Sequence, residues 1–158
     1  TGHGFTVHAC TLRPLSRGYL TLRSARPDDP PLIHAGYLSE GRDLDVLLEG
    51  VRWSRAIIRA QPLAQFRGSE VFPGDGITER KELEQVLRRK TETIYHPVGT
   101  CRMGSDPDSV VDCDLRVCGV HGLRVVDASV MPRLVGGNTN APTMMIAEKA
   151  ADALLAHP

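Results

Sequence analysis

The chain has 158 residues, of which 41% are hydrophobic and 24% charged, and its 19 basic residues equal its 19 acidic ones in number. This length and composition are typical of a globular chain with a core of its own, and they exclude a disordered or fibrous protein. The balanced charge gives no support to a nucleic-acid partner, and no apolar run reaches the roughly 20 residues that cross a bilayer.

Three short strands are predicted near the start of the chain. Branched and aromatic side chains favour strands over Phe5–Cys10 and Tyr19–Ser24, and a further short strand over Leu32–His34. Between the last two, Arg26–Pro31 has three prolines in six residues and is predicted to be a loop. We therefore expect a small sheet in this part of the chain.

Two helices follow. Asp43 is a candidate N-cap for a helix that runs to about Ala60, because apolar residues recur there at three-to-four-residue spacing. Gly50 weakens the middle of this helix by about 1 kcal/mol relative to alanine, which indicates close packing at that point. A second helix is predicted from Thr78 to about Lys90, since its acidic first turn and basic last turn match the helix dipole.

The segment Tyr95–Gly104 combines a histidine, a proline, two glycines and a cysteine where a regular element would show apolar periodicity. Pro97 disfavours the helical conformation for His96, which we expect to be extended. A histidine with a free ring edge can accept a proton near neutral pH. The alternative is a structural histidine in a turn, and this segment alone does not decide between the two.

A buried strand over Leu123–Asp127 is predicted to end in a carboxylate, and such a carboxylate in an α/β sheet points into the ligand crevice. The glycine-rich turn Gly136–Pro142 then leads into a helix from Thr143 to about Leu155, which Asn140 can cap. Its predicted apolar stripe is Met144, Ala147, Ala151 and Leu154. Glycines before a helix N-terminus let a ligand approach the backbone N–H groups, although most such turns only start a helix.

The four cysteines are Cys10, Cys101, Cys113 and Cys118, and they form no C-x-x-C pair. We therefore expect reduced thiols in an intracellular protein. A zinc site built from Cys113, Cys118 and His121 is conceivable, but its spacing is not a standard zinc pattern and the neighbouring aspartates suit a turn equally well. We expect no metal.

Three segments together resemble the C-terminal signatures of the glucose-methanol-choline (GMC) family of flavin oxidoreductases: Tyr95–Gly104, Leu123–Pro132 and Gly137–Asp152. The similarity is nearly continuous from about Thr93 to Leu155, and it is greatest to choline dehydrogenases and bacterial alcohol dehydrogenases. It implies an α+β fold in which residues 1–95 are part of a substrate-binding domain, with a sheet covered by helices. Residues 96–158 would then complete the FAD-binding domain with a C-terminal strand and helix.

The resemblance also implies roles for individual residues. His96 matches the active-site base that takes the proton of the alcohol, and Asn138 matches the position that hydrogen-bonds the substrate oxygen. Asp127 and Ala128 match the segment along the ribityl–pyrophosphate chain of the flavin, and the helix opened by Asn140 matches the element that faces its pyrimidine edge. The implied cofactor-binding positions are Asp127, Ala128, Asn138, Thr139 and Asn140.

The implied function is the FAD-dependent oxidation of a primary alcohol, choline-like or aliphatic, to the aldehyde, with oxygen or a quinone as electron acceptor. The chain has no G-x-G-x-x-G segment and no initiator methionine, so we expect a piece of a longer cytoplasmic protein that binds flavin poorly and is inactive by itself. Peripheral attachment to the inner membrane is left open. The alternatives are a cyanohydrin lyase on the same scaffold and a non-catalytic binding or zinc module.

Overall fold

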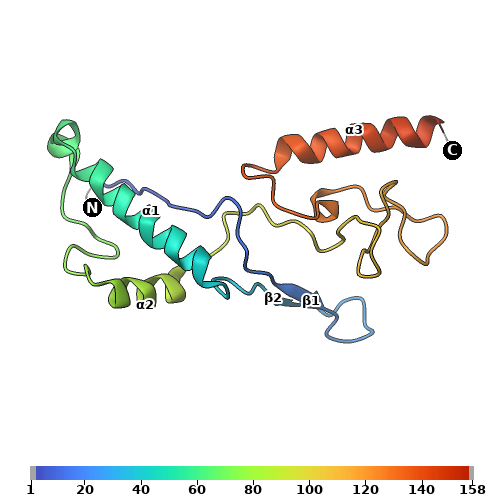
Figure 1. The fold of residues 1–158 in the computed structure, drawn as a ribbon, viewed down its shortest axis with the longest axis horizontal. Helices are drawn as coiled ribbons and strands as arrows, with labels where there is room; N and C mark the ends of the chain where they lie inside the picture. Colours follow the sequence, from blue (N-terminus) through green and yellow to red (C-terminus); the bar gives the residue numbers. More distant parts are fainter. Residues whose placement is uncertain (1–2, 157–158) are drawn as a thin grey trace. The chain divides into compact units, whose positions relative to one another are not determined.

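The computed structural model describes residues 3–156, which form two compact units that we treat separately. The first unit comprises residues 3–18 and 33–92, and the second comprises residues 19–32 and 93–156. In chain order the elements of the described residues are β1 (Tyr19–Thr21), β2 (Leu32–His34), α1 (Gly41–Arg59), the 3-10 helix η1 (Gln61–Phe66), α2 (Arg80–Lys90), the 3-10 helix η2 (Ala128–Val130) and α3 (Asn140–Ala156) (Figure 1). Together with the pairing of β1 and β2 in a two-stranded sheet, these helices confirm the predicted α+β class.

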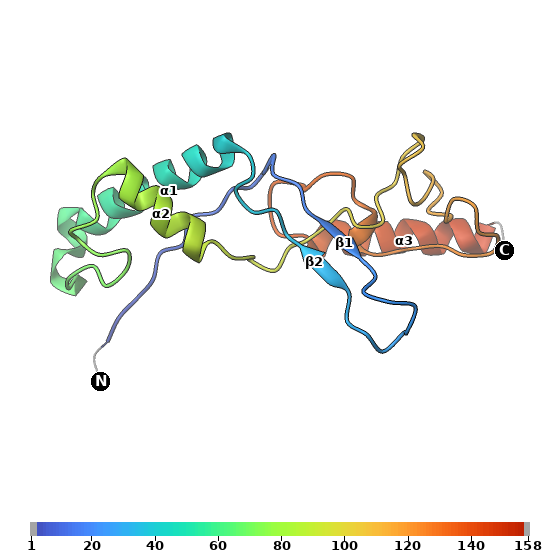
Figure 2. The same ribbon diagram turned by 90° about the horizontal axis from the view of Figure 1, so that it is seen from below.

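In the first unit, α1 and α2 lie side by side (Figures 1 and 2). Their shared core contains Leu38, Leu44 and Leu47, against which Leu48 of α1 and Leu87 of α2 pack. Leu44, Leu47 and Leu48 belong to the apolar stripe predicted for α1, and Leu38 precedes that helix. The apolar stripe predicted for α1 is therefore confirmed, while α1 begins three residues earlier and α2 two residues later than predicted.

Asp43 does not cap α1, because the N-cap residue is Glu40. The Asp43 side chain is buried, and its carboxylate accepts hydrogen bonds from the backbone N–H groups of Leu15, at 2.9 and 3.0 Å, and Ser16, at 2.7 Å. Burial raises the pKa of this carboxyl, but the hydrogen bonds from Ser16 and Leu15 outweigh it and the pKa is lowered overall. Asp43 thus fastens the N-terminal segment to α1.

The close packing predicted at Gly50 is confirmed, since a Cβ added there would lie 2.6 Å from the Cβ of Ala9. The segment that contains Ala9 was predicted to be the strand Phe5–Cys10, and this prediction is wrong: it has no regular secondary structure. Branched side chains favour a strand only where a neighbouring strand pairs with the backbone. Here the segment packs against the helix α1 instead of pairing with a strand. The strand at Leu32–His34 is confirmed, and the predicted Tyr19–Ser24 shortens to β1.

The core of the second unit is built mainly by irregular segments and α3. Val111, Leu115, Val130 and Ala150 are buried together, and Ile146 packs against them. The predicted strand over Leu123–Asp127 is not formed, because its only ladder contact is an isolated bridge between Arg116 and Arg124. Isolated bridges also join Val111 to Met103 and to Val117.

The helix α3 presents a different face to this core than the one predicted. Ile146 and Ala150 face the core, whereas the four residues of the predicted stripe are all exposed: Met144, Ala147, Ala151 and Leu154. Apolar residues surround this helix, so their spacing does not single out one face. The helix begins at Asn140, three residues before the predicted start.

Candidate functional site

His96 lies in the irregular chain that enters the second unit after α2. The preceding residue, Tyr95, has a left-handed backbone conformation with φ of 66°, and its N–H donates to the Thr93 hydroxyl at 2.9 Å. This local turn, followed by the rigid Pro97, fixes the direction in which the His96 side chain leaves the backbone. The His96 side chain is half-buried.

The chain after His96 is held against η2. The N–H of Cys101 donates to the Ser129 carbonyl at 3.1 Å, and the N–H of Met103 donates to the Val130 carbonyl at 2.9 Å. Gly99 has φ of 90°, and a Cβ there would lie 3.3 Å from the carbonyl oxygen of Met131. A glycine is therefore required for the close approach of these two segments.

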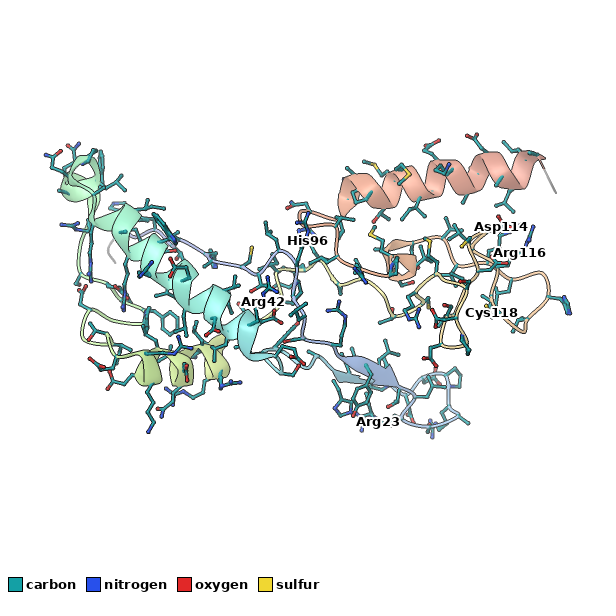
Figure 3. All side chains as sticks on the ribbon, viewed as in Figure 1. Arg23, Arg42, His96, Asp114, Arg116 and Cys118 are labelled. Atoms are coloured by element: carbon teal, nitrogen blue, oxygen red, sulfur yellow. The ribbon has the colours of Figure 1, made fainter. Side chains whose placement is uncertain are left out.

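The His96 ring meets the turn that opens α3 (Figure 3). Nδ1 lies 3.1 Å from the hydroxyl oxygen of Thr139, and the backbone N–H of Thr139 points toward Nδ1 with its nitrogen 3.5 Å away. Thr139 is only 8% exposed. Its carbonyl accepts hydrogen bonds from the backbone N–H of Thr143 at 3.0 Å and from the Thr143 hydroxyl at 2.6 Å. The first turn of α3 thus fixes the residue that contacts the imidazole.

The predicted site residues Asn138 and Asn140 flank Thr139 and are both exposed. Before them, Gly136 has φ of 82°, and a Cβ added at Gly137 would meet nothing within 4 Å. The turn is therefore open beside Gly137, with carboxamide side chains on either side of the residue that contacts His96. The structure brings His96 and Thr139 together, and sequence reasoning missed this contact because the two residues are 43 positions apart.

Asp127 is positioned differently from the sequence prediction. Its carboxylate does not end a strand but caps η2, where it accepts hydrogen bonds from the N–H of Ser129, at 2.7 Å, and from the Ser129 hydroxyl. The Asp127 side chain is exposed, and Ala128, the first residue of η2, is half-buried. A short side chain with a carboxylate readily makes such a bond two residues ahead, which explains why a 3-10 turn begins directly after Asp127.

An ion pair that was not predicted closes the loop after this segment. The guanidinium of Arg102 binds both carboxylate oxygens of Asp106, at 2.6 and 2.8 Å, and the buried Ser109 donates to Asp106 at 3.0 Å. The hydrogen bonds from Arg102, and then from Ser109, hold the pKa of the Asp106 carboxyl well below its usual range. The only feature of the sequence that indicates this ion pair is an arginine four residues before an aspartate that is itself followed by Pro107.

Within residues 3–156 no group of three or more histidine, cysteine, aspartate or glutamate residues is placed to hold a metal ion. Cys113, Cys118 and His121, considered from the sequence as zinc ligands, are all exposed. None of the helices in the same range has the length and apolar character that crossing a membrane requires.

Comparison with known proteins places these observations in a family. Residues 14–147 match the family model described as GMC oxidoreductase. The chain is 51% identical over 154 residues to an alcohol dehydrogenase (acceptor) of Pseudomonas putida and 51% identical over 156 residues to the mitochondrial choline dehydrogenase of Mus musculus. Each alignment includes 98% of this chain, but only 28% of the length of the alcohol dehydrogenase and 26% of the length of the choline dehydrogenase.

A solved structure is similar as well. An FAD-dependent oxidoreductase from Chaetomium thermophilum matches with a TM-score of 0.81 and 32% sequence identity, over 90% of this chain and 25% of that one. The chain thus spans about a quarter of the length of the proteins that it matches.

Proposed function

Because the chain belongs to the GMC oxidoreductase family, we propose that it forms the C-terminal part of an FAD-dependent enzyme that oxidises a primary alcohol to the aldehyde. The similarity to an alcohol dehydrogenase and a choline dehydrogenase supports an alcohol as the substrate, either choline-like or aliphatic. Oxygen or a quinone would take the electrons.

The observation that carries this proposal is the contact between His96 and the turn that opens α3. Nδ1 of His96 is engaged by Thr139, and Nε2 has no hydrogen-bond partner among residues 3–156. The ring is therefore held by one nitrogen, while the other is available to a substrate. A catalytic base must be held where it can reach the proton that it removes. The contact at Nδ1 holds the ring and leaves Nε2 free to reach that proton.

The chemistry assigned to the chain begins with proton transfer. Nε2 of His96 accepts the hydroxyl proton of the alcohol, and the negative charge that develops on the oxygen makes the neighbouring C–H bond a better hydride donor. The carboxamide of Asn138 donates a hydrogen bond to that oxygen. A donor placed where charge develops can contribute about 3–4 kcal/mol to the stabilisation of the transition state.

The residues present fit a flavin. The turn is open beside Gly137, Asn138 and Asn140 are exposed, and the first turn of a 17-residue helix has backbone N–H groups without helical partners. Such donors suit the oxygen and nitrogen atoms of a flat heterocycle, and the positive end of the helix favours a negative charge on it. We assign Asn138, Thr139 and Asn140 to the ring. FAD, when bound, supplies the acceptor for the hydride.

Asp127 and Ala128 are assigned to the ribityl–pyrophosphate chain of FAD. One carboxylate oxygen of Asp127 is engaged by Ser129, so the backbone of this pair and the remaining oxygen are the groups available for the contact. A flavin with its phosphates would come close to η2, whose N-terminal residue is Ala128.

The test is anaerobic addition of alcohols to the full-length flavoprotein that carries this chain, with the flavin absorbance as readout. An oxidoreductase loses the oxidised-flavin absorbance when its alcohol is added, and the aldehyde appears in equal amount. A cyanohydrin lyase consumes a cyanohydrin with no change in absorbance. Failure of every primary alcohol to reduce the flavin would contradict the proposal.

A further inference from the structure

We propose that Thr139 is a positioning residue that sets the tautomer of His96. Its hydroxyl oxygen accepts a hydrogen bond from the Nδ1–H group of the imidazole, so that the lone pair of the neutral ring is on Nε2. This inference rests on the proposed function, in which Nε2 of His96 takes the proton of the alcohol.

The tautomer of the ring depends on its hydrogen-bond partners. A neutral imidazole carries one N–H and one lone pair, and the hydrogen bond at one nitrogen decides which nitrogen is protonated. Thr139 is the only hydrogen-bond partner of His96 among residues 3–156, and it contacts Nδ1 alone. The tautomer therefore depends on what Thr139 presents to that nitrogen.

Thr139 presents two groups with opposite preferences. Its backbone N–H can only donate, and it favours a lone pair on Nδ1, but it lies 3.5 Å away, at the outer limit of a hydrogen bond. Its hydroxyl lies at 3.1 Å and can accept as well as donate, because the hydroxyl hydrogen rotates. The nearer group is thus the one that allows a proton on Nδ1.

Proton transfer strengthens this preference. Once Nε2 has taken the proton of the alcohol, both ring nitrogens carry hydrogen and both must donate. Only the hydroxyl oxygen of Thr139 can accept from Nδ1 in that state, because the backbone N–H cannot. The hydroxyl therefore stabilises the imidazolium more than the neutral ring, as a hydrogen bond to a charged group is stronger than one between neutral groups.

The hydroxyl is also held in place before any substrate binds. Thr139 is buried, and its carbonyl is tied to the first turn of α3 by two hydrogen bonds from Thr143. Thr139→Val keeps the shape of threonine and removes the hydroxyl, whereas Thr139→Ser keeps the hydroxyl. Thr21→Val is a matched control, because Thr21 is an exposed threonine of the same unit that lies outside the turn contacting His96.

The direct experiment is nitrogen NMR of the full-length flavoprotein labelled with ¹⁵N-histidine, with His96→Gln to identify the resonances of His96. The expected result is a protonated Nδ1 and an unprotonated Nε2 in the wild type and in Thr139→Ser. Thr139→Val should shift the proton toward Nε2. A wild-type ring with its proton on Nε2 would overturn the proposal.

The kinetic experiment measures the rate of anaerobic flavin reduction by the alcohol. Thr139→Val should lower the limiting rate about 10–100-fold, with little change in the apparent affinity for alcohol or in flavin content, while Thr139→Ser stays within about threefold. Thr21→Val should behave as the wild type. A Thr139→Val rate equal to that of the wild type, or a Thr139→Ser rate as low as that of the valine variant, would overturn the proposal. Undiminished reduction by His96→Ala would instead refute the proposed function, and the NMR result would still report the tautomer.

Discussion

Replacing Asp43 by asparagine should destabilise the first unit. The buried carboxylate accepts from two backbone N–H groups, whereas an asparagine offers a single carbonyl oxygen and turns an N–H₂ group toward one of those donors. A hydrogen bond to a charged group contributes about 1.5–3 kcal/mol, and an unsatisfied buried donor costs about 1–3 kcal/mol. We therefore expect Asp43→Asn to lower the free energy of unfolding by about 2–4 kcal/mol at neutral pH.

The loss of unfolding free energy in Asp43→Asn should become smaller as the pH is lowered. The folded chain lowers the pKa of Asp43, so the carboxylate stabilises the folded state fully at pH values above its unfolded pKa of about 3.9. That stabilisation is lost as the pH falls through the lower, folded pKa. The difference in unfolding free energy between the wild type and Asp43→Asn should therefore narrow from pH 7 to pH 3.

The assay is urea denaturation followed by the fluorescence of Trp53, which is the only tryptophan of the chain and belongs to α1. Asp45→Asn is the matched control, because Asp45 lies two residues further along the same helix but is exposed and paired with the exposed Arg80. This surface change should cost less than about 1 kcal/mol. Equal losses for the two variants, or no loss for Asp43→Asn, would refute the reasoning.

Two further predictions concern other contacts. Gly50→Ala should not give the gain of about 1 kcal/mol expected in an open helix, because its Cβ would lie 2.6 Å from that of Ala9. Combining it with Ala9→Gly should restore the gain in the unfolding free energy, and stabilisation by Gly50→Ala alone would contradict the packing. NMR titration should find the Asp106 carboxyl ionised well below its usual pH range, and Arg102→Gln should raise its pKa toward the ordinary value. If Arg102→Gln left the pKa of Asp106 unchanged, the guanidinium would not be the cause of the lowered pKa.

The helices could be predicted because their signals are local. The leucines of α1 and α2 recur at helical spacing, and Leu44, Leu47 and Leu83 are indeed buried. For α3 the same reasoning predicted a helix but the wrong face, since Met144 is exposed and Ile146 faces the core. Spacing identifies a helix reliably, but it chooses the buried face only when the opposite face is polar.

Strands and long-range contacts were less predictable. The segments Phe5–Cys10 and Leu123–Asp127 have the side chains of strands, but a strand also needs a neighbour, which a local pattern does not reveal. Asp43 was expected at a helix cap and instead binds Leu15, 28 positions away. The candidate site follows the same pattern. His96 and the turn before α3 could be proposed as candidates from their residue types, whereas the contact between His96 and Thr139 could be found only from the fold.

The proposed role of His96 is tested most directly by the rate of anaerobic flavin reduction in His96→Ala of the full-length protein. His121→Ala is the control, since His121 is an exposed histidine of the same unit. Loss of the base should reduce the rate about 10²–10⁴-fold while the flavin stays bound, and the control should retain the wild-type rate. A His96→Ala protein that is reduced as fast as the wild type would contradict the assignment of His96 as the base.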